Sequence, residues 1–214
     1  MSQLYLVTDS AIAQAAGHTL AFVVDEACRA GVRWVQLREK SLSTRAFLEL
    51  GMDLKRITQA YGAKLIINDR VDIALAIDAD GVHVGQDDMP YELVRSLIGP
   101  DKIIGLSINN LAELEAAQNA NVDYLGIATI FPTGTKQDTS SLLGIAGLQE
   151  ICSRTQLPTF AIGGINTRTI QDITRTGATG SAVVSAICGQ ASPYEATREL
   201  IRLMGDAQSK VLSV

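Results

Sequence analysis

Cysteine is scarce in this sequence. Its 214 residues include three, Cys28, Cys152 and Cys188, and no two of them have the Cys-x-x-Cys spacing. An odd and widely spaced set indicates a reducing compartment rather than a disulfide framework. We interpret each cysteine as a buried apolar side chain and not as a nucleophile.

Long apolar runs are also missing. No stretch reaches the ~20 apolar residues that a membrane-spanning helix needs. The N-terminal run Met1-Ser-Gln-Leu-Tyr5 lacks a basic region followed by an apolar one, so we expect no signal peptide. The sequence therefore predicts a soluble, cytoplasmic protein with no membrane partner.

Positive charge is not in excess. The formal net charge is −5, so we do not expect a nucleic-acid partner held by broad positive potential. Any site for an anion must be a local group of arginine and lysine side chains on an acidic background. The oligomeric state cannot be read from the sequence, and a homo-oligomer is compatible with it.

Short β-rich segments alternate with longer helical patterns along the chain. The predicted strands are Leu4–Val7, Trp34–Leu37, Leu65–Ile67, Gly81–Val84, Ile103–Leu106, Tyr124–Ile127, Thr159–Ile162 and Ser181–Val184. The predicted helices are Leu20–Ala30, Thr44–Tyr61, Val71–Ile77, Tyr91–Ile98, Leu111–Asn119, Ile145–Arg154, Thr167–Thr176 and Tyr194–Met204. Strict alternation of strand and helix implies parallel strands with right-handed crossovers.

Eight such units in 214 residues fit an α/β fold, the (β/α)8 TIM barrel, at the lower end of its size range. A doubly wound open sheet is the alternative. The count of eight and the lack of Gly-x-Gly-x-x-Gly after the first strand favour the barrel. No linker or low-complexity segment interrupts the chain, so we expect one domain over residues 1–214, with 205–214 as a flexible tail.

The run from Trp34 to Lys40 begins as a buried strand and ends in charge. Alternate side chains of a strand share a face, so Gln36, Arg38 and Lys40 are expected to point the same way. If they point inward, two cations are held in a partly desolvated place. That costs free energy unless a bound anion compensates their charge. The run therefore predicts an anion site at the end of the second strand.

Two carboxylates follow neighbouring strands. Asp69 comes directly after the third strand and Asp88 lies shortly after the fourth. Because barrel sites gather at the carboxyl ends of the strands, these side chains could approach each other and bind Mg²⁺ together with phosphate oxygens. The alternative is that each aspartate caps the following helix. Asp87 competes with Asp88 for the metal role.

Two further segments suggest phosphate binding. Thr133-Gly-Thr-Lys136 is a hydroxyl-rich loop in which glycine permits close approach of backbone N–H groups to an oxyanion and lysine adds a charge. Gly163-Gly164 and Ser185 follow the seventh and eighth strands, a frequent phosphate position in barrels. The alternatives are a solvated loop and a tight turn. One diphosphate and one monophosphate in a single barrel mouth would mean two substrates that are joined.

Two polar residues near the expected rim receive a lesser role. We interpret His83, within the fourth strand, as a structural side chain, because no partner has the spacing of a metal site or a catalytic triad. Ser107 has no visible base and is not expected to be a nucleophile. It is better suited to donate a hydrogen bond to an anion.

At this point the motifs resemble one family. The segments are Tyr5-Leu-Val-Thr-Asp9, Gln36-Leu-Arg-Glu-Lys40, Ile67-Asn-Asp69, His83-Val-Gly-Gln-Asp-Asp88, Phe131-Pro-Thr-Gly-Thr-Lys136 and Ile162-Gly-Gly-Ile165. Together they resemble thiamine phosphate synthase, in that family's order, from Leu4 to about Met204.

The resemblance implies an enzyme, a transferase that joins a hydroxymethylpyrimidine diphosphate to a thiazole phosphate with loss of pyrophosphate, through a pyrimidine-stabilised cation. It implies Mg²⁺ on Asp69 and Asp88. The implied pyrimidine diphosphate ligands are Gln36, Leu37, Arg38, Glu39, Lys40, Asn68, Ser107 and Lys136, of which Arg38, Lys40, Ser107 and Lys136 would act in catalysis. The implied thiazole phosphate ligands are Thr133, Gly134, Thr135, Gly164, Val184 and Ser185.

The sequence also departs from the family. Ala128-Thr129 stands where members usually carry Gly-Pro, and Thr139-Ser140 replaces small residues. Two other functions stay open. A thiazole tautomerase would share the barrel and the thiazole phosphate site but typically lacks the diphosphate and metal residues. A non-catalytic regulatory barrel would bind a phosphorylated ligand and would need no carboxylate pair.

Overall fold

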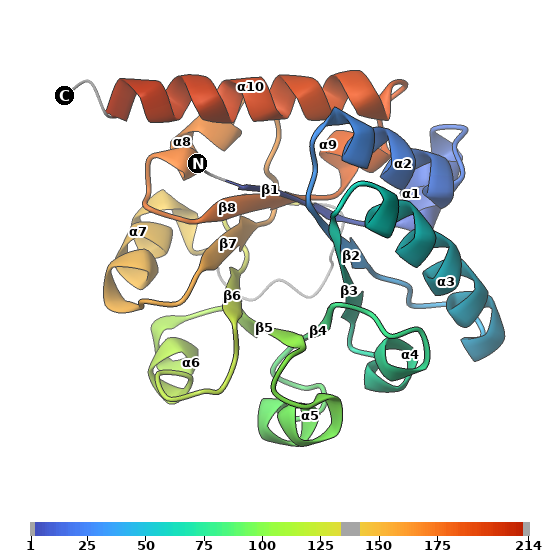
Figure 1. The fold of residues 1–214 in the computed structure, drawn as a ribbon. Helices are drawn as coiled ribbons and strands as arrows, with labels where there is room; N and C mark the ends of the chain where they lie inside the picture. Colours follow the sequence, from blue (N-terminus) through green and yellow to red (C-terminus); the bar gives the residue numbers. More distant parts are fainter. Residues whose placement is uncertain (1–2, 134–141, 212–214) are drawn as a thin grey trace.

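Eight parallel strands close into a barrel in the computed structural model, which describes residues 3–133 and 142–211 (Figure 1). The strands are β1 (Gln3–Val7), β2 (Trp34–Leu37), β3 (Lys64–Asn68), β4 (Gly81–Val84), β5 (Ile103–Ile108), β6 (Tyr124–Ile127), β7 (Thr159–Ile162) and β8 (Gly180–Val183). They neighbour one another in sequence order, and β1 pairs with β8. The predicted TIM barrel is confirmed, and the open sheet is excluded because no edge between β1 and β8 remains.

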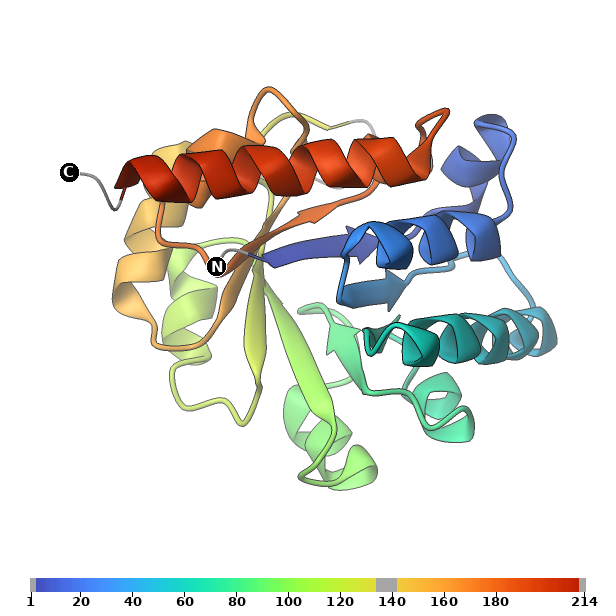
Figure 2. The same cartoon turned by 45° about the horizontal axis from the view of Figure 1, so that its top comes forward.

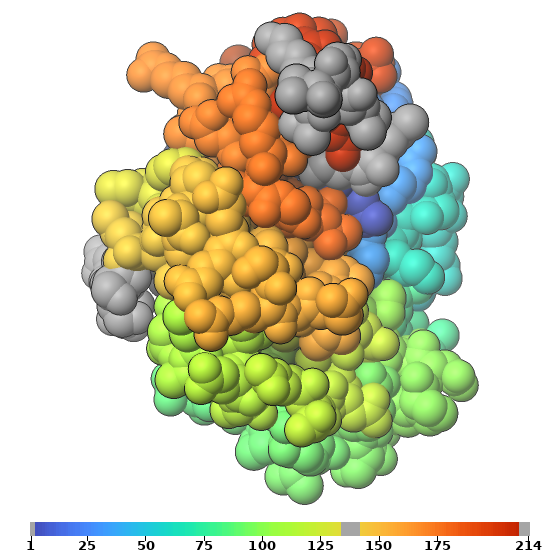
Figure 3. Space-filling view, turned by 90° about the vertical axis from the view of Figure 1, so that its left-hand side faces the viewer, coloured from blue at the N-terminus to red at the C-terminus, as the bar shows by residue number. Residues whose placement is uncertain are grey.

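Helices surround the barrel on its outer face (Figure 2). They are α1 (Ser10–Ala15), α2 (Leu20–Ala30), α3 (Thr44–Ala60), α4 (Val71–Ala76), α5 (Tyr91–Ile98), α6 (Leu111–Ala116), α7 (Gly144–Arg154), α8 (Ile170–Thr174), α9 (Ser185–Cys188) and α10 (Pro193–Val211). In the side view of Figure 3, α6, α7 and α8 follow one another over one flank of the barrel. Among the described residues, no helix has the length and apolar content needed to cross a membrane.

Two short helices, α1 and α9, are absent from the sequence prediction. Helix α1 has six residues and α9 has four, too few for a 3.6-residue hydrophobic period to stand out. The start of α1 has a local cause, because the Asp9 side chain accepts a hydrogen bond from the Ile12 N–H at 3.0 Å.

The sequence predicts a flexible tail from residue 205, but the structure has a helix there. Helix α10 continues to Val211 and packs against α2, α8 and α9. The reason is an apolar stripe that passes the predicted helix end, since Met204 and Ala207 are both buried. Gly205 and Asp206 between them lie on the exposed face of the helix, and their low apolar content predicted a tail instead.

Side chains alternate between two cores along each strand. On β1, Leu4 and Leu6 join the large core between barrel and helices, whereas Tyr5 and Val7 face the barrel interior. The lower interior is filled by aromatic rings: the centroids of Tyr5 and Phe160 are 5.2 Å apart, and those of Tyr5 and Trp34 are 5.6 Å apart. This aromatic plug fills the barrel interior toward the amino ends of the strands, below a cavity lined by their carboxyl ends.

Candidate active site

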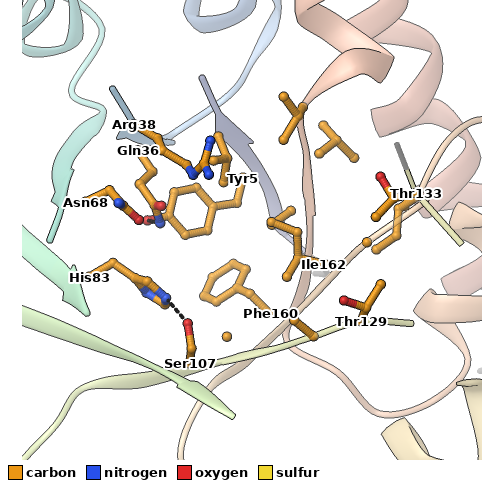
Figure 4. A pocket seen from close by; sticks show the side chains of 18 of the residues that line it. Tyr5, Gln36, Arg38, Asn68, His83, Ser107, Thr129, Thr133, Phe160 and Ile162 are labelled. Atoms are coloured by element: carbon orange, nitrogen blue, oxygen red, sulfur yellow. Dashed lines mark hydrogen bonds between the residues drawn. The ribbon is translucent and has the colours of Figure 1, made fainter. Parts of the chain in front are cut away.

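A cavity of about 680 Å³ opens above the aromatic plug. It is lined by residues at the carboxyl ends of all eight strands and in the loops that follow them. Figure 4 shows Gln36, Arg38 and Asn68 on one side and Thr129 and Thr133 on the opposite side. The cavity falls within the ~300–1,000 Å³ range of small-molecule sites, at the end of the barrel where such sites occur.

The second strand supplies the cationic wall. Gln36, Arg38 and Lys40 all line the cavity, as their alternation predicts. The strand itself ends at Leu37, so the arrangement of the next residues depends on Thr8. The Thr8 N–H donates to the Gln36 carbonyl at 2.9 Å, and the Arg38 N–H donates to the Thr8 hydroxyl at 3.0 Å. These two bonds hold the chain extended through Arg38, one residue beyond the end of β2, so the Arg38 side chain still faces inward.

The intervening side chains, those of Leu37 and Glu39, face away from the cavity, so neither side chain is placed to contact a ligand there. Leu37 is fully buried in the core between barrel and helices. Glu39 is partly buried, and its carboxylate accepts a hydrogen bond from the Ser10 hydroxyl. Burial raises the pKa of Glu39, while the Ser10 hydroxyl opposes that shift. The physical reason is the period of two, which sends neighbours of Arg38 outward.

The two predicted metal carboxylates lie next to each other on the cavity. Lys40 Nζ is 2.6 Å from Asp69 Oδ2. Burial raises the pKa of Asp69; the Lys40 hydrogen bond lowers it, and the adjoining Asp88 carboxyl raises it further. Asp88 Oδ2 also accepts from the Gly85 N–H at 2.8 Å, which fixes the loop after β4. Asp87, by contrast, is exposed and does not line the cavity.

The helix-capping alternative for these aspartates is excluded. The residue that precedes α4 is Arg70, and the one that precedes α5 is Pro90; neither helix has a side-chain cap. Asp69 instead sits in the left-handed region, with φ of 60°, which is uncommon outside glycine. Its N–H donates to the His83 carbonyl at 2.8 Å, so the turn is held by the neighbouring strand.

The carboxylate pair suits Mg²⁺ with a phosphorylated ligand. Among residues 3–133 and 142–211, no group of three or more His, Cys, Asp or Glu side chains could hold a metal. Mg²⁺ commonly uses one or two carboxylates and takes its other ligands from water and phosphate oxygens. Asp69 and Asp88 therefore fit a metal that arrives with, or is completed by, a diphosphate.

The opposite side of the cavity is rich in glycine and small polar groups. Gly164, Val184 and Ser185 line it, and so does Thr133. Gly164 has φ of 63°, and a Cβ there would lie 2.6 Å from the Pro132 carbonyl oxygen, so only glycine fits this approach of two loops. Gly134, Thr135 and Lys136 lie outside the described residues. Asn68 lines the cavity on the cationic side, where the resemblance implies it.

Sequence reasoning missed the partner of Ser107. Nε2 of His83 lies 2.9 Å from the Ser107 hydroxyl, so the serine has an imidazole beside it. Residue 83 pairs in register with Gly105, which places Ser107 one inward position farther along β5. Alternation on two adjacent strands was the signal that could have joined these residues. Tyr5 and Tyr124, also missed, line the floor of the same cavity.

The Ala128-Thr129 departure lies on the cavity. Thr129 is buried and lines the wall near Gly163 (Figure 4). A Cβ on Gly163 would lie 2.5 Å from the Thr129 methyl carbon Cγ2, so the two residues are packed closely. The polar β-branched side chain is therefore accommodated by glycine on the neighbouring strand end.

A closed (β/α)8 barrel whose cavity joins cationic, acidic and glycine-rich walls defines a class of barrel enzymes with phosphorylated substrates. The profile of the family described as thiamine monophosphate synthase matches residues 4–187. The chain belongs to this family, whose members are transferases of thiamine biosynthesis.

Individual relatives agree with this assignment. A thiamine-phosphate synthase of Clostridium novyi is 46% identical over 185 residues, which cover 86% of this chain and 90% of that protein. One of Vibrio parahaemolyticus is 48% identical over 202 residues, or 94% and 98% of the two chains. The solved structure of thiamine phosphate pyrophosphorylase from Pyrococcus furiosus has a TM-score of 0.87 at 36% identity and covers 96% of both chains.

Proposed function

We propose that this protein joins 4-amino-2-methyl-5-(diphosphooxymethyl)pyrimidine to a thiazole phosphate and releases thiamine phosphate and pyrophosphate. The observation that carries the proposal is the contact of Lys40 with Asp69, beside Asp88, on a wall that also holds Arg38. Cations and carboxylates side by side suit a diphosphate that brings a divalent ion. A monophosphate alone would need only the cations.

The reaction proposed is a dissociative substitution. The bond between the pyrimidine methylene carbon and the diphosphate oxygen breaks, and its electron pair leaves with the diphosphate. A new bond then forms from the thiazole ring nitrogen to the methylene carbon. Such a step needs the charge of the leaving group to be neutralised and does not need a strong base.

The residues of the cationic wall would neutralise that charge. The Thr8 bonds fix the backbone at Arg38, and Lys40 lies in contact with Asp69, so both donors start from the cavity wall. Asp69 and Asp88 would hold Mg²⁺, which when bound supplies further positive charge to the diphosphate oxygens. Asn68, Ser107 and Lys136 complete the proposed diphosphate side, Lys136 from outside the described residues.

The glycine-rich side would hold the second substrate. Gly164, Val184 and Ser185 line the part of the cavity across from Arg38 and, with Thr133, Gly134 and Thr135, are the proposed ligands of thiazole phosphate. Holding the thiazole against the developing cation removes the entropic cost of bringing the two molecules together. Cytoplasmic location remains an expectation from the sequence.

A direct assay tests the proposal. The protein is incubated with the pyrimidine diphosphate, the thiazole phosphate and Mg²⁺, and thiamine phosphate and pyrophosphate are measured. Arg38→Gln is expected to lower kcat/KM by ~10²-fold, as for loss of one transition-state donor. Arg45→Gln is the matched control, because Arg45 is exposed and outside the cavity lining. Equal activity of both variants would contradict the role of Arg38.

The two alternatives give different results in the same assay. A thiazole tautomerase would isomerise its thiazole substrate and would form no thiamine phosphate. A regulatory barrel would bind a phosphorylated ligand in isothermal titration, equally with and without Mg²⁺, and would release no pyrophosphate. The carboxylate pair beside Lys40 argues against both, since neither needs it.

A further inference from the structure

A row of five hydrogen-bonded side chains crosses the floor of the cavity. Gln36 Nε2 donates to the Tyr5 hydroxyl at 3.1 Å, and the Tyr5 and Tyr124 hydroxyl oxygens are 2.8 Å apart. The Tyr124 hydroxyl is 2.9 Å from His83 Nδ1, and His83 Nε2 is 2.9 Å from the Ser107 hydroxyl. Figure 4 shows Gln36 and Ser107 at the two ends, with the Tyr5 ring between them.

The row lies inside the barrel and away from bulk water. Tyr5 and Tyr124 are each 1% exposed, and Gln36 and His83 are 5% and 8% exposed. Burial raises the pKa of both tyrosines far above the ordinary value, so both hydroxyls keep their protons. Each hydroxyl must therefore donate one hydrogen bond as well as accept one.

Two strand glycines make room for this row. A Cβ on Gly105 would lie 2.4 Å from His83 Nδ1 and 2.4 Å from the Tyr124 hydroxyl, directly at the bond between them. A Cβ on Gly126 would lie 2.8 Å from His83 Cε1. Glycine weakens a strand interior, and its presence there often marks a close approach by another group. Here the approaching group is the imidazole with its tyrosine partner.

The partners decide the direction of donation. The Gln36 amide N–H can only donate, so Tyr5 accepts there and gives its proton to Tyr124. Tyr124 then gives its proton to His83 Nδ1, which must be unprotonated. The remaining nitrogen, Nε2, carries the hydrogen and donates to Ser107. In the reverse direction Tyr5 would accept twice, and the hydrogen bonds described for Tyr5 give its own proton no acceptor.

We propose that this one-way chain holds His83 as the Nε2–H tautomer and thereby makes the Ser107 hydroxyl a committed hydrogen-bond donor to the cavity. Because Ser107 accepts from His83, its own proton is left to point at a ligand. At the other end, the Gln36 amide N–H donates to Tyr5, and this leaves the Gln36 carbonyl oxygen to face the cavity. His83, Tyr124 and Tyr5 are positioning residues, and Ser107 and Gln36 are the groups that meet substrate.

The consequence for catalysis rests on the proposed function. The donor from Ser107 would meet an oxygen of the departing diphosphate, and the Gln36 carbonyl would meet an N–H of the aminopyrimidine. If the chain ran the other way with the Gln36 N–H still on Tyr5, Ser107 would offer a lone pair in place of a proton. That polarity would repel a diphosphate oxygen, so the direction of the chain decides whether the Ser107 end of the cavity accepts an anion.

The tautomer is measured without any substrate. The chain has two histidines, His18 and His83, and ¹⁵N-histidine labelling with His18→Gln isolates the His83 ring signals. Protonated and unprotonated ring nitrogens differ strongly in ¹⁵N shift. We expect a protonated Nε2 and an unprotonated Nδ1 at neutral pH, and a mixture of tautomers in Tyr124→Phe. A protonated Nδ1 in the wild type, or an unchanged ring in Tyr124→Phe, would overturn the proposal.

Activity of two histidine variants tests the link to Ser107. A glutamine amide at position 83 reaches the place of Nε2 and can donate to Ser107, whereas an asparagine amide reaches only the place of Nδ1. We expect His83→Asn to lower kcat by ~10²-fold with little change in KM, and His83→Gln to recover most of the loss. Circular dichroism and thermal unfolding check that both variants fold.

The coupling of the two residues completes the test. In a Ser107→Ala background, His83→Asn is expected to have little further effect, because its action passes through Ser107. Full additivity of the two losses would overturn the positioning role. If no variant and no wild type forms thiamine phosphate, the proposed function fails, while the ring spectrum still reports whether the chain has the stated direction.

Discussion

The Lys40 ammonium and the Asp69 carboxylate meet at 2.6 Å across two neighbouring strand ends, with side chains that are 57% and 20% exposed. An ion pair this exposed contributes little to folding stability, because water screens both charges and the lysine loses side-chain freedom. Its importance lies in what the pair prevents. Lys40 donates to Asp69 Oδ2, so that oxygen of a proposed Mg²⁺ ligand is shared with a competing cation.

Replacement of this lysine is therefore expected to separate metal binding from turnover. In Lys40→Met the long apolar side chain stays, but the cation that competes for Asp69 is gone. We expect the substrate-free variant to bind Mg²⁺ more tightly than the wild type, because two carboxylates are free, while kcat/KM falls by ~10²-fold through loss of a diphosphate donor. Mn²⁺ titration followed by electron paramagnetic resonance measures the affinity. Weaker binding of the metal would count against competition at Asp69.

The two neighbouring aspartates in the loop after β4 provide a matched pair of variants. Asp88 lines the cavity beside Asp69, and Asp87 is exposed outside the lining. We expect Asp88→Asn to lower kcat/KM by ~10²-fold or more, with partial recovery at high Mg²⁺, and Asp87→Asn to stay near the wild type. The asparagine oxygen can still accept from the Gly85 N–H, so the loop is retained. A larger loss of kcat/KM in Asp87→Asn than in Asp88→Asn would assign the metal role to Asp87 instead.

Glycine at position 164 is expected to matter for the thiazole side in particular. Gly164 and Gly177 have φ of 63° and 89°, so alanine is strained at both positions. A Cβ at 164 also meets the loop at Phe131 and Pro132, whereas a Cβ at 177 has nothing within 4 Å. We expect both variants to lose stability, Gly164→Ala more because of the added clash, and only Gly164→Ala to raise KM for thiazole phosphate, by ~10-fold or more, because ligand groups move. Thermal unfolding and steady-state kinetics separate the two effects.

The end of α10 is expected to be part of the folded barrel. Ala207 is fully buried, and Gly205 is exposed with open space around it. We expect Ala207→Arg to destabilise the protein by ~2 kcal/mol or more, since a buried charge has no partner there. For a chain of this size that lowers Tm by about 4–8 °C. Gly205→Arg adds the same charge on the exposed face and is expected to leave Tm nearly unchanged. Equal Tm values for the two variants would show that the end of α10 does not contribute to the stability of the barrel.

The fold follows from the sequence because its signals are local and repeated. The strand bounds Trp34–Leu37, Gly81–Val84, Tyr124–Ile127 and Thr159–Ile162 coincide with the prediction. Each is a short apolar run next to a helical pattern, and eight repeats leave few ways to bury the strands other than a closed barrel. Where the local signal was short, as in α1 and α9, or diluted by polar residues, as at the end of α10, the prediction failed.

The site divides in the same way. That Gln36, Arg38 and Lys40 share a wall follows from the period of two, and that Asp69 approaches Asp88 follows from the adjacency of β3 and β4. Both are relations along one strand or between sequential strands. The row from Gln36 to Ser107 is different, because it joins β2, β1, β6, β4 and β5 across the barrel.

Residues and their faces could thus be read from the chain: a barrel, a cationic strand end, two rim carboxylates and a glycine-rich rim. What remained for the closed barrel to decide was which side chains meet through its interior. Tyr5 reaches Tyr124 over 119 positions of sequence, and Tyr124 reaches His83 only because Gly105 leaves space. Spacing along a chain reports neighbours on one element, whereas contacts across a barrel depend on its curvature and on the volume of every side chain inside it. The strand-end run Trp34–Lys40 predicts an anion site from the sequence alone, whereas the proposed direction of the hydrogen bonds beneath it depends on the closed barrel.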